Sequence, residues 1–414
     1  MRTLKAALIC GSLATSIAGF LFTLSIFDPL CRVFAGGSAM MPAVWAQWLG
    51  AAVLAFALAW TSIDILPLAL RCVVIFVALT ETAVLAWVLR LVGITWPPFT
   101  ALTGGFLGAA FGFIYTNTVP GRRKRLIQQR FAGRISVATY RRLLDSDEAL
   151  DCAGERRECS LVVCEIFNRE LLRETLSPAD YVALSSAFLQ AGAGALMEAG
   201  GIMTPGGGDS LRAIFGAPLT DPDHAAKACQ AAHALGRRLE TSCQEAIERW
   251  KAAPDYRIGI NSGEMIAAAY APDSGAGFNV EGEPAEFCRR LCLANTFYGS
   301  RMLLGPRAFE LANAAVEVRP IELIRRRSQD APDEIQEIYE FLAPKDALTT
   351  QEIERRDLFW RGVILFRKGS WSEAAASFQA TLREGDDAPA RFYLERIAHA
   401  RAGEQALDWD SARL

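Results

Sequence analysis

Hydrophobic positions are unevenly distributed along this chain of 414 residues. Residues 1–120 hold long apolar runs, whereas the remainder alternates apolar and polar positions as a soluble protein does. The runs are residues 6–27, 42–59, 71–87 and 96–115. Each is near the ~20 residues that a helix needs to cross a bilayer. The pattern therefore predicts a region of four transmembrane helices.

Basic residues flank this region. Arg2 and Lys5 precede the first run, and a basic cluster at residues 122–125 follows the fourth. Positive flanks stay on the cytoplasmic side, and an even number of spans returns the chain to that side. We therefore expect a multi-pass protein of the inner (plasma) membrane, with its N-terminus and its polar part in the cytoplasm. A cleaved signal peptide is the alternative for the first run, but its long apolar core and the three following spans favour retention.

Three charged residues lie in or near the third run: Arg71, Glu81 and Arg90. An ionisable group inside a membrane span is by default a functional candidate. A structural interpretation is that the two arginines reach the two interfaces and that Glu81 faces another helix. We favour the structural interpretation.

Residues 121–150 connect the apolar region to the rest of the chain. They are rich in Arg and Gln and have apolar residues at helical spacing. This spacing predicts an amphipathic linker helix. A coupling helix that transmits a signal and a plain spacer would have much the same sequence, so both interpretations stay open.

Short strand patterns then alternate with helical ones in residues 151–345. Helices are predicted at residues 178–199, 222–252 and 284–296, each beginning near a proline, whose missing N–H costs little at a helix start. His224 lies at one of these starts, where we expect a solvated or capping role. The pattern predicts an α+β domain.

Charge and cysteine content narrow the function classes. The net charge of −3 offers no basic footprint for nucleic acid. The ten cysteines are scattered, and the close pair Cys288 and Cys292 lies within a predicted helix, where two packed small residues are more plausible than a metal site.

Candidate chemistry begins at a glycine-rich turn with one acid, Gly206-Gly207-Gly208-Asp209, between two apolar strands. Glycines let a backbone approach phosphates closely, and a carboxylate can hold a divalent metal. A plain hairpin tip is the alternative. Three further segments accompany the turn: a strand that ends in Glu165, a strand over residues 256–264, and a strand-to-helix turn over residues 278–290.

In this order and at this spacing, the four segments resemble the class III adenylate/guanylate cyclase domain, over roughly residues 155–342. The resemblance implies a mixed sheet packed with helices and a site at the interface of a homodimer or of a heterodimer with another cyclase chain. It also implies conversion of ATP or GTP into a 3′,5′-cyclic nucleotide and pyrophosphate, with two Mg²⁺ or Mn²⁺ ions. A diguanylate cyclase is disfavoured, because the acid–Phe pair after that family's turn is missing.

The resemblance assigns the metal-binding positions to Glu165 and Asp209, and it places Gly208 beside the substrate. It assigns the transition-state arginine to Arg290. Glu165 stands where the family has Asp, and Glu286 stands where the family has the Asn that orients the ribose. Glu286 adds a negative charge beside a triphosphate, so both changes predict impaired catalysis.

The base-reading positions fall at Pro205 and Asn279. Proline has no side-chain donor, so adenine recognition by the family's lysine is lost, whereas Asn279 can hydrogen-bond either purine. Together the substitutions predict weak or no activity in a homodimer. The alternative is a catalytically inactive pseudocyclase that acts as a dimerisation, regulatory or nucleotide-sensing partner.

Residues 346–414 predict a helical hairpin. Gly362, Ala374 and Phe378 have the spacing of a tetratricopeptide repeat, and the resemblance specifies no partner. The expected organisation is therefore a membrane region (1–120), a linker (121–150), a cyclase-like domain (151–345) and this tail.

Overall fold

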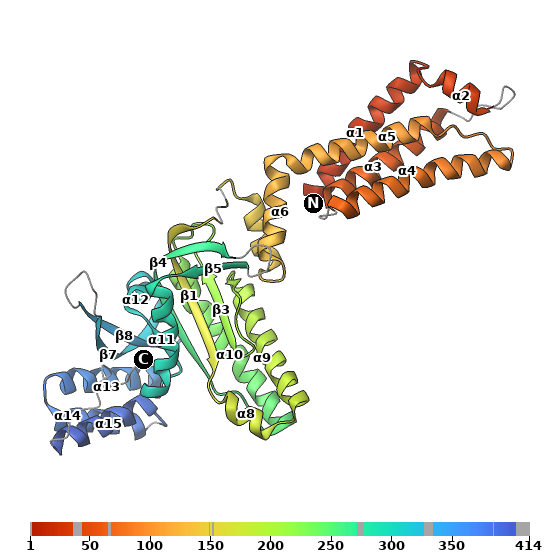
Figure 1. The fold of residues 1–414 in the computed structure, drawn as a ribbon. Coiled ribbons are helices and arrows are strands. Elements are labelled where there is room, and N and C mark those ends of the chain that lie inside the picture. The colour runs from red at the N-terminus through yellow and green to blue at the C-terminus, as the bar shows by residue number, and fades with distance from the viewer. Residues whose placement is uncertain are drawn as a thin grey trace. The chain divides into compact units, whose positions relative to one another are not determined.

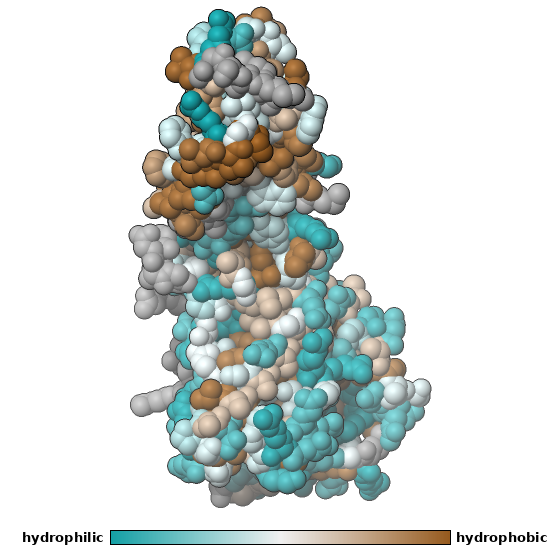
Figure 2. Space-filling view, turned by 90° about the vertical axis from the view of Figure 1, so that its right-hand side faces the viewer, coloured by the Kyte–Doolittle hydropathy of each residue, from teal (hydrophilic) through white to brown (hydrophobic). Residues whose placement is uncertain are grey.

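The computed structural model describes residues 2–35, 44–64, 68–148, 150, 153–270, 277–326, 334–383 and 385–402. They form two compact units, Met1–Gln128 and Gln129–Leu414. On the face shown in Figure 2, hydrophobic side chains gather on the first unit, whereas the second unit is mainly hydrophilic.

The first unit consists of helices (Figure 1). They are α1 (Arg2–Thr23), α2 (Asp28–Ala35), α3 (Val44–Asp64), α4 (Leu68–Leu91) and α5 (Phe99–Asn117). Four of them, α1, α3, α4 and α5, are long and apolar enough to cross a membrane, which confirms the four predicted apolar helices. Helix α2 was not predicted. The first apolar run ends early because Ser25 has φ +56°, a left-handed conformation that cannot continue an α-helix.

Small residues allow close packing between α3 and α5. A Cβ added at Gly108 would lie 2.3 Å from the backbone oxygen of Ala55, so only glycine fits at this crossing. Burial differs strongly among the four apolar helices: 33%, 39% and 44% of the spans in α1, α3 and α5 are buried, against 6% for α4.

The predicted linker helix is two helices, α6 (Val119–Phe131) and α7 (Val137–Asp145). Gly133 between them has φ +72°. Ser136 then caps α7, because its side chain accepts a hydrogen bond from the backbone N–H of Thr139 at 3.1 Å. A glycine in the left-handed region followed by a serine N-cap ends one helix and starts another.

The second unit is built on one mixed sheet with the strand order β2-β3-β1-β4-β6-β8-β7, and β5 pairs with β4. Strands β4 and β6 are parallel and the other neighbours are antiparallel. The strands are β1 (Glu155–Ile166), β2 (Ile202–Met203), β3 (Ser210–Phe215), β4 (Tyr256–Tyr270), β5 (Gly277–Glu281), β6 (Met302–Leu304), β7 (Val316–Arg326) and β8 (Glu334–Pro344).

Helices cover both faces of this sheet (Figure 1). They are α8 (Arg169–Thr175), α9 (Pro178–Glu198), α10 (His224–Trp250), α11 (Glu283–Tyr298) and α12 (Pro306–Ala312), with a short 3₁₀ helix at Asn313–Ala315. Val162, Cys164 and Ile166 of β1 share a core with residues of α9 and α10. On the other face α11 lies close to the strands, where the Cys288 thiol donates to the Leu161 carbonyl at 3.1 Å.

Up to residue 402, the tail has three helices instead of the predicted two: α13 (Thr350–Arg367), α14 (Trp371–Arg383) and α15 (Ala388–Arg401). Phe359, Phe378 and Tyr393, one from each helix, share a core. A Cβ at Gly362 would lie 2.7 Å from the Phe378 ring. This contact explains the small residue in the repeat-like pattern, and Tyr393 adds the third helix to the same core.

A buried arginine joins the tail to the sheet. Arg319 of β7 donates to Glu340 of β8 at 2.7 Å and to Asp387, the N-cap of α15, at 2.7 Å. Its guanidinium also lies 4.2 Å from the centroid of the Phe359 ring. The two carboxylates raise the pKa of Arg319 against the opposing effect of its burial.

Candidate functional site

The pairing of β1 with β3 brings the two predicted carboxylates to the same end of the sheet. Glu165 lies opposite Ser210 in the register. The backbone N–H of Ile166 donates to the carbonyl of Asp209 at 3.0 Å. Because neighbours along a strand point to opposite faces, Glu165 points away from the core that contains Cys164 and Ile166.

The glycine turn before β3 is held by a serine. The N–H of Gly207 donates to the Ser210 hydroxyl at 3.0 Å. A Cβ at Gly206 would lie 2.7 Å from the carbonyl oxygen of Ser210, so a side chain there would force the turn open. Gly208 and Pro205 are exposed on this turn, and the Asp209 side chain is 20% exposed.

Each predicted metal ligand faces an arginine of the same chain. Arg169, at the start of α8, donates to Asp209 Oδ2 at 2.6 Å. Arg212 of β3 lies with its Nη2 3.9 Å from Glu165 Oε1. Among the residues described, no three His, Cys, Asp or Glu side chains form a cluster that could hold a metal. Arg169 already pairs with Asp209, so a metal ion at Asp209 would have to displace that guanidinium.

Sequence reasoning missed Arg169 and Arg212. Arg212 carries a signal that a register argument could have used. Arg212 lies opposite Val163, two residues from the Glu165–Ser210 pair, and therefore shares the sheet face of Glu165. Arg169 follows β1 closely but meets an acid 40 residues away, which only the fold brings near.

Helix α11 carries the predicted ribose and transition-state positions in its first two turns. Glu286 accepts a hydrogen bond from Arg289 at 2.9 Å, and Arg290 lies 3.4 Å from Glu283. The pKa of Glu286 is lowered, first by the hydrogen bond from Arg289, and the charges of Arg289, Arg290 and Arg212 add to this shift against the opposing effect of burial. Glu286 is therefore held as an anion.

The two predicted base-reading residues lie on different parts of the sheet. Asn279 is half-buried on β5, opposite Ala268 of β4. Pro205 precedes β3, and β1 separates β3 from β4 in the strand order. The pyrrolidine ring of Pro205 offers no hydrogen-bond donor.

His224 is buried, which corrects the expectation of a solvated or capping residue. Its Nδ1 lies 2.7 Å from the Ser160 hydroxyl, which also lies 2.5 Å from the Ser262 hydroxyl. The His224 side chain fills the space where β1, β4 and the start of α10 meet. Its position at a helix start, read from the sequence alone, had suggested an exposed side chain.

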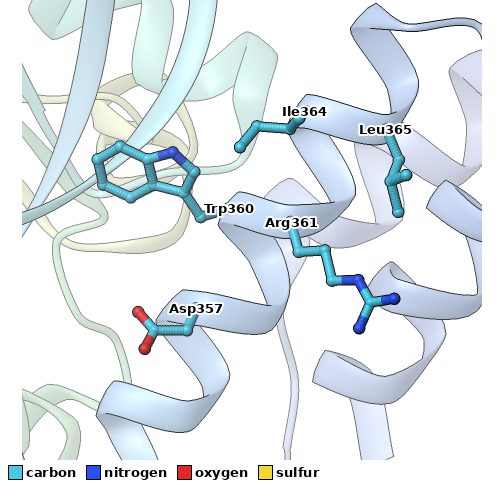
Figure 3. A pocket seen from close by; sticks show the side chains of 5 residues that line it. All are labelled: Asp357, Trp360, Arg361, Ile364 and Leu365. Atoms are coloured by element: carbon cyan, nitrogen blue, oxygen red, sulfur yellow. The ribbon is translucent and has the colours of Figure 1, made fainter.

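A hollow of about 320 Å³ lies elsewhere, on the tail. All five lining side chains come from α13 (Figure 3): Asp357, Trp360, Arg361, Ile364 and Leu365. It is a surface depression along one helix and includes none of the predicted cyclase positions.

The chain has sequence relatives among known proteins. No family model matches the chain. Adenylate cyclase 1 of Rhizobium meliloti (strain 1021) is 24% identical over 202 residues, which are 48% of this chain and 30% of that relative. The chain thus spans about a third of that curated relative.

Among solved structures, the guanylyl cyclase Cya2 is 18% identical with a TM-score of 0.42 and covers 48% of this chain and 98% of its own. The adenylyl cyclase CyaB from P. aeruginosa is 18% identical with a TM-score of 0.42 and covers 47% of this chain and 99% of its own. The chain is therefore similar in sequence to an adenylate cyclase over about half of its length, and that similarity accompanies four apolar helices at the N-terminus.

Proposed function

We propose that this chain is a membrane-bound nucleotidyl cyclase homologue with a degenerate site, whose homodimer converts ATP or GTP weakly or not at all. In the reaction, the ribose 3′-oxygen bonds to the α-phosphorus and loses its proton, while the bond from the α-phosphorus to pyrophosphate breaks. The similarity to an adenylate cyclase supports this reaction class. The placement of Asp209 beside the end of β1 at a glycine turn supports the location of the site.

The residues present can serve part of this reaction. Gly208 lies on an exposed turn that a phosphate can approach, and Arg290 offers positive charge to the phosphates once it leaves Glu283. Glu286 opposes this, because its carboxylate repels a triphosphate. Pro205 leaves base selection to Asn279. The expected result is weak nucleotide binding with poor discrimination between ATP and GTP.

The arginine pairs favour a second function, that of a regulatory or nucleotide-sensing partner. The observation that carries it is the 2.6 Å contact between Arg169 and Asp209. A carboxylate neutralised by its own chain attracts a divalent cation less strongly. In that role the chain dimerises with an active cyclase, to which it can lend Arg290.

The membrane region and the tail complete the proposal. The four apolar helices anchor the chain in the inner membrane, with the basic residues 122–125 and the second unit in the cytoplasm. We propose a membrane region at residues 1–120, a linker at 121–150, a cyclase-like domain at 151–345 and a tail at 346–414. The tail, tetratricopeptide-like in its spacing, extends the second unit and offers a surface for a partner.

A turnover assay on the full-length protein in membranes tests the proposal. ATP and GTP are supplied separately with Mn²⁺, cyclic product is followed by mass spectrometry, and Asp209→Ala serves as the control. Weak product that disappears in the variant supports the degenerate cyclase. No product supports the regulatory partner, and turnover at the rate of ordinary enzymes, about 10 per second, contradicts both.

A further inference from the structure

Helix α4 is the least covered of the four apolar helices, with 6% of its span buried. An open groove of about 390 Å³ runs along its uncovered side. The groove is lined by Phe76, Val77, Thr80, Glu81, Val84, Leu85 and Val88. Its lining is apolar except for one threonine and one glutamate.

The lining residues have a regular spacing. Val77, Glu81, Val84 and Val88 follow one another at intervals of four, three and four residues. This is the spacing of a heptad seam, in which one helix packs against another along its whole length. A single polar position in such a seam sets the register of the two helices, because only one alignment lets the polar groups meet.

Glu81 makes lipid alone an unfavourable cover for this face. At 1.5 Å per residue it lies ~20 Å from the start of α4 and ~15 Å from its end, within the ~30 Å hydrocarbon layer. Within the part of the chain that the structure describes, Glu81 has no hydrogen bond or ion pair. Acyl chains offer no partner, and ionisable residues in membrane spans almost always face a protein partner or a water-filled cavity.

We propose that α4 of one copy packs in parallel against α4 of a second copy along the seam of Val77, Glu81, Val84 and Val88, with the two Glu81 carboxyl groups hydrogen-bonded to each other. A second copy fits for two reasons. Both copies have the same orientation in the membrane, so a parallel pair about a two-fold axis brings Glu81 to the same depth on both sides. The valines of the seam then pack against each other in register.

This interface is independent of the catalytic state of the second unit. It rests on insertion of α4 into a membrane and on no step of the cyclase reaction. It also specifies the helix that Glu81 was expected to face, because that helix belongs to the partner copy.

Photo-crosslinking in membranes tests the seam on the full-length chain. The photoreactive residue benzoylphenylalanine replaces Val84 in one variant and its exposed neighbour Ala83, which lies about 100° away around the helix, in the other. The expected result is a product with the mass of a dimer from position 84 and at most a trace from position 83. Equal yields at the two positions, or a product only with a different protein, would overturn the proposal.

Substitution of Glu81 tests the central contact. Glu81→Gln keeps a group that can hydrogen-bond across the pair and is expected to retain the crosslink from position 84. Glu81→Leu removes it, and the crosslinked fraction should reflect a roughly 3- to 30-fold weaker association. A Glu81→Leu variant that crosslinks as well as the parent would overturn the role of Glu81. Cyclic-nucleotide production, measured separately, can fail while the crosslink persists, so the two proposals fail independently.

Discussion

Nη1 of Arg169 lies 2.6 Å from Oδ2 of Asp209. A metal ion bound by Asp209 would have to occupy the same space as this guanidinium group. Nη2 of Arg212 lies 3.9 Å from Oε1 of Glu165, which is a longer and weaker ion pair. The Arg169 side chain is 49% exposed, so water screens the pair and it contributes at most about 1 kcal/mol. Single residues of this kind can change a site without changing the fold.

Replacing Arg169 with alanine is expected to raise the affinity of the chain for Mn²⁺ by up to about fivefold, because Asp209 loses its competing cation. Electron paramagnetic resonance of free Mn²⁺ measures the affinity directly. The matched control is Arg238→Ala, which breaks an exposed pair with Glu198 on α9 and should leave the affinity unchanged. Tight binding to the parent chain that Asp209→Asn abolishes would show that Arg169 does not block the site.

His224 predicts a pH dependence of stability. Burial lowers its pKa, while Glu158 and Asp221 oppose the shift and Arg307 adds to it. The unfolded chain therefore binds the proton more readily, and stability should fall as pH drops below the unfolded value of about 6.5 towards the lower folded pKa. Urea unfolding between pH 7 and pH 5 should show a shallower slope in His224→Gln.

The control for this prediction is Ser262→Ala. It removes a hydroxyl from the same network but no titrating group, so it should lower stability at every pH and leave the slope as it is. An identical slope in His224→Gln and the parent would assign the acid sensitivity to other groups.

Among the helices and strands, the attachment of the tail helices to the sheet includes one buried charged side chain, Arg319. Arg319 contacts two carboxylates and the Phe359 ring, and its side chain is 8% exposed. Arg319→Met leaves Glu340 buried without its cation and leaves Asp387 with only the longer contact to Arg355, at 3.3 Å. Breaking a buried pair in this way costs about 3–5 kcal/mol. The full chain in detergent should show a lower unfolding temperature and faster proteolysis of α13–α15.

The control variant for Arg319→Met is Arg238→Ala. It should change the free energy of unfolding by no more than about 0.5 kcal/mol, because its pair with Glu198 is exposed. If Arg319→Met is equally mild, the apolar core around Phe378 and Tyr393 holds the tail to the sheet by itself.

For the whole molecule, restoring the family residues should restore turnover. The triple substitution Glu165→Asp, Pro205→Lys and Glu286→Asn introduces the residues that class III cyclases have at these positions. They are the metal-binding Asp, the base-reading Lys and the ribose-orienting Asn. Because one lost transition-state donor costs about 10²–10³ in rate and losses within one site are not additive, we expect at least a tenfold gain in cyclic AMP production. The assay uses ATP and Mn²⁺ with full-length protein in membranes.

Adding Asp209→Ala to the triple variant should abolish the gain. A triple variant no more active than the parent would mean that other residues, Arg169 and Arg212 first, keep the site inactive, and adding Arg169→Ala then separates these causes.

The sequence by itself determined the apolar helices and the order of motifs that resembles a cyclase domain, because both are local patterns. Apolar run length depends on composition alone, and the glycine turn before Asp209 is readable from residue types. The starts of α9 and α11 were near their predicted positions, since proline marks a helix start whatever surrounds it.

Only the tertiary structure decided what surrounds the site. Arg169 and Arg212 are ordinary surface residues in the sequence, and they become counter-ions of Asp209 and Glu165 only because β1 pairs with β3. The burial of His224 and the third tail helix likewise follow from contacts distant in sequence. Local patterns specify elements, whereas the charge balance of a site depends on register between strands, which no single segment encodes.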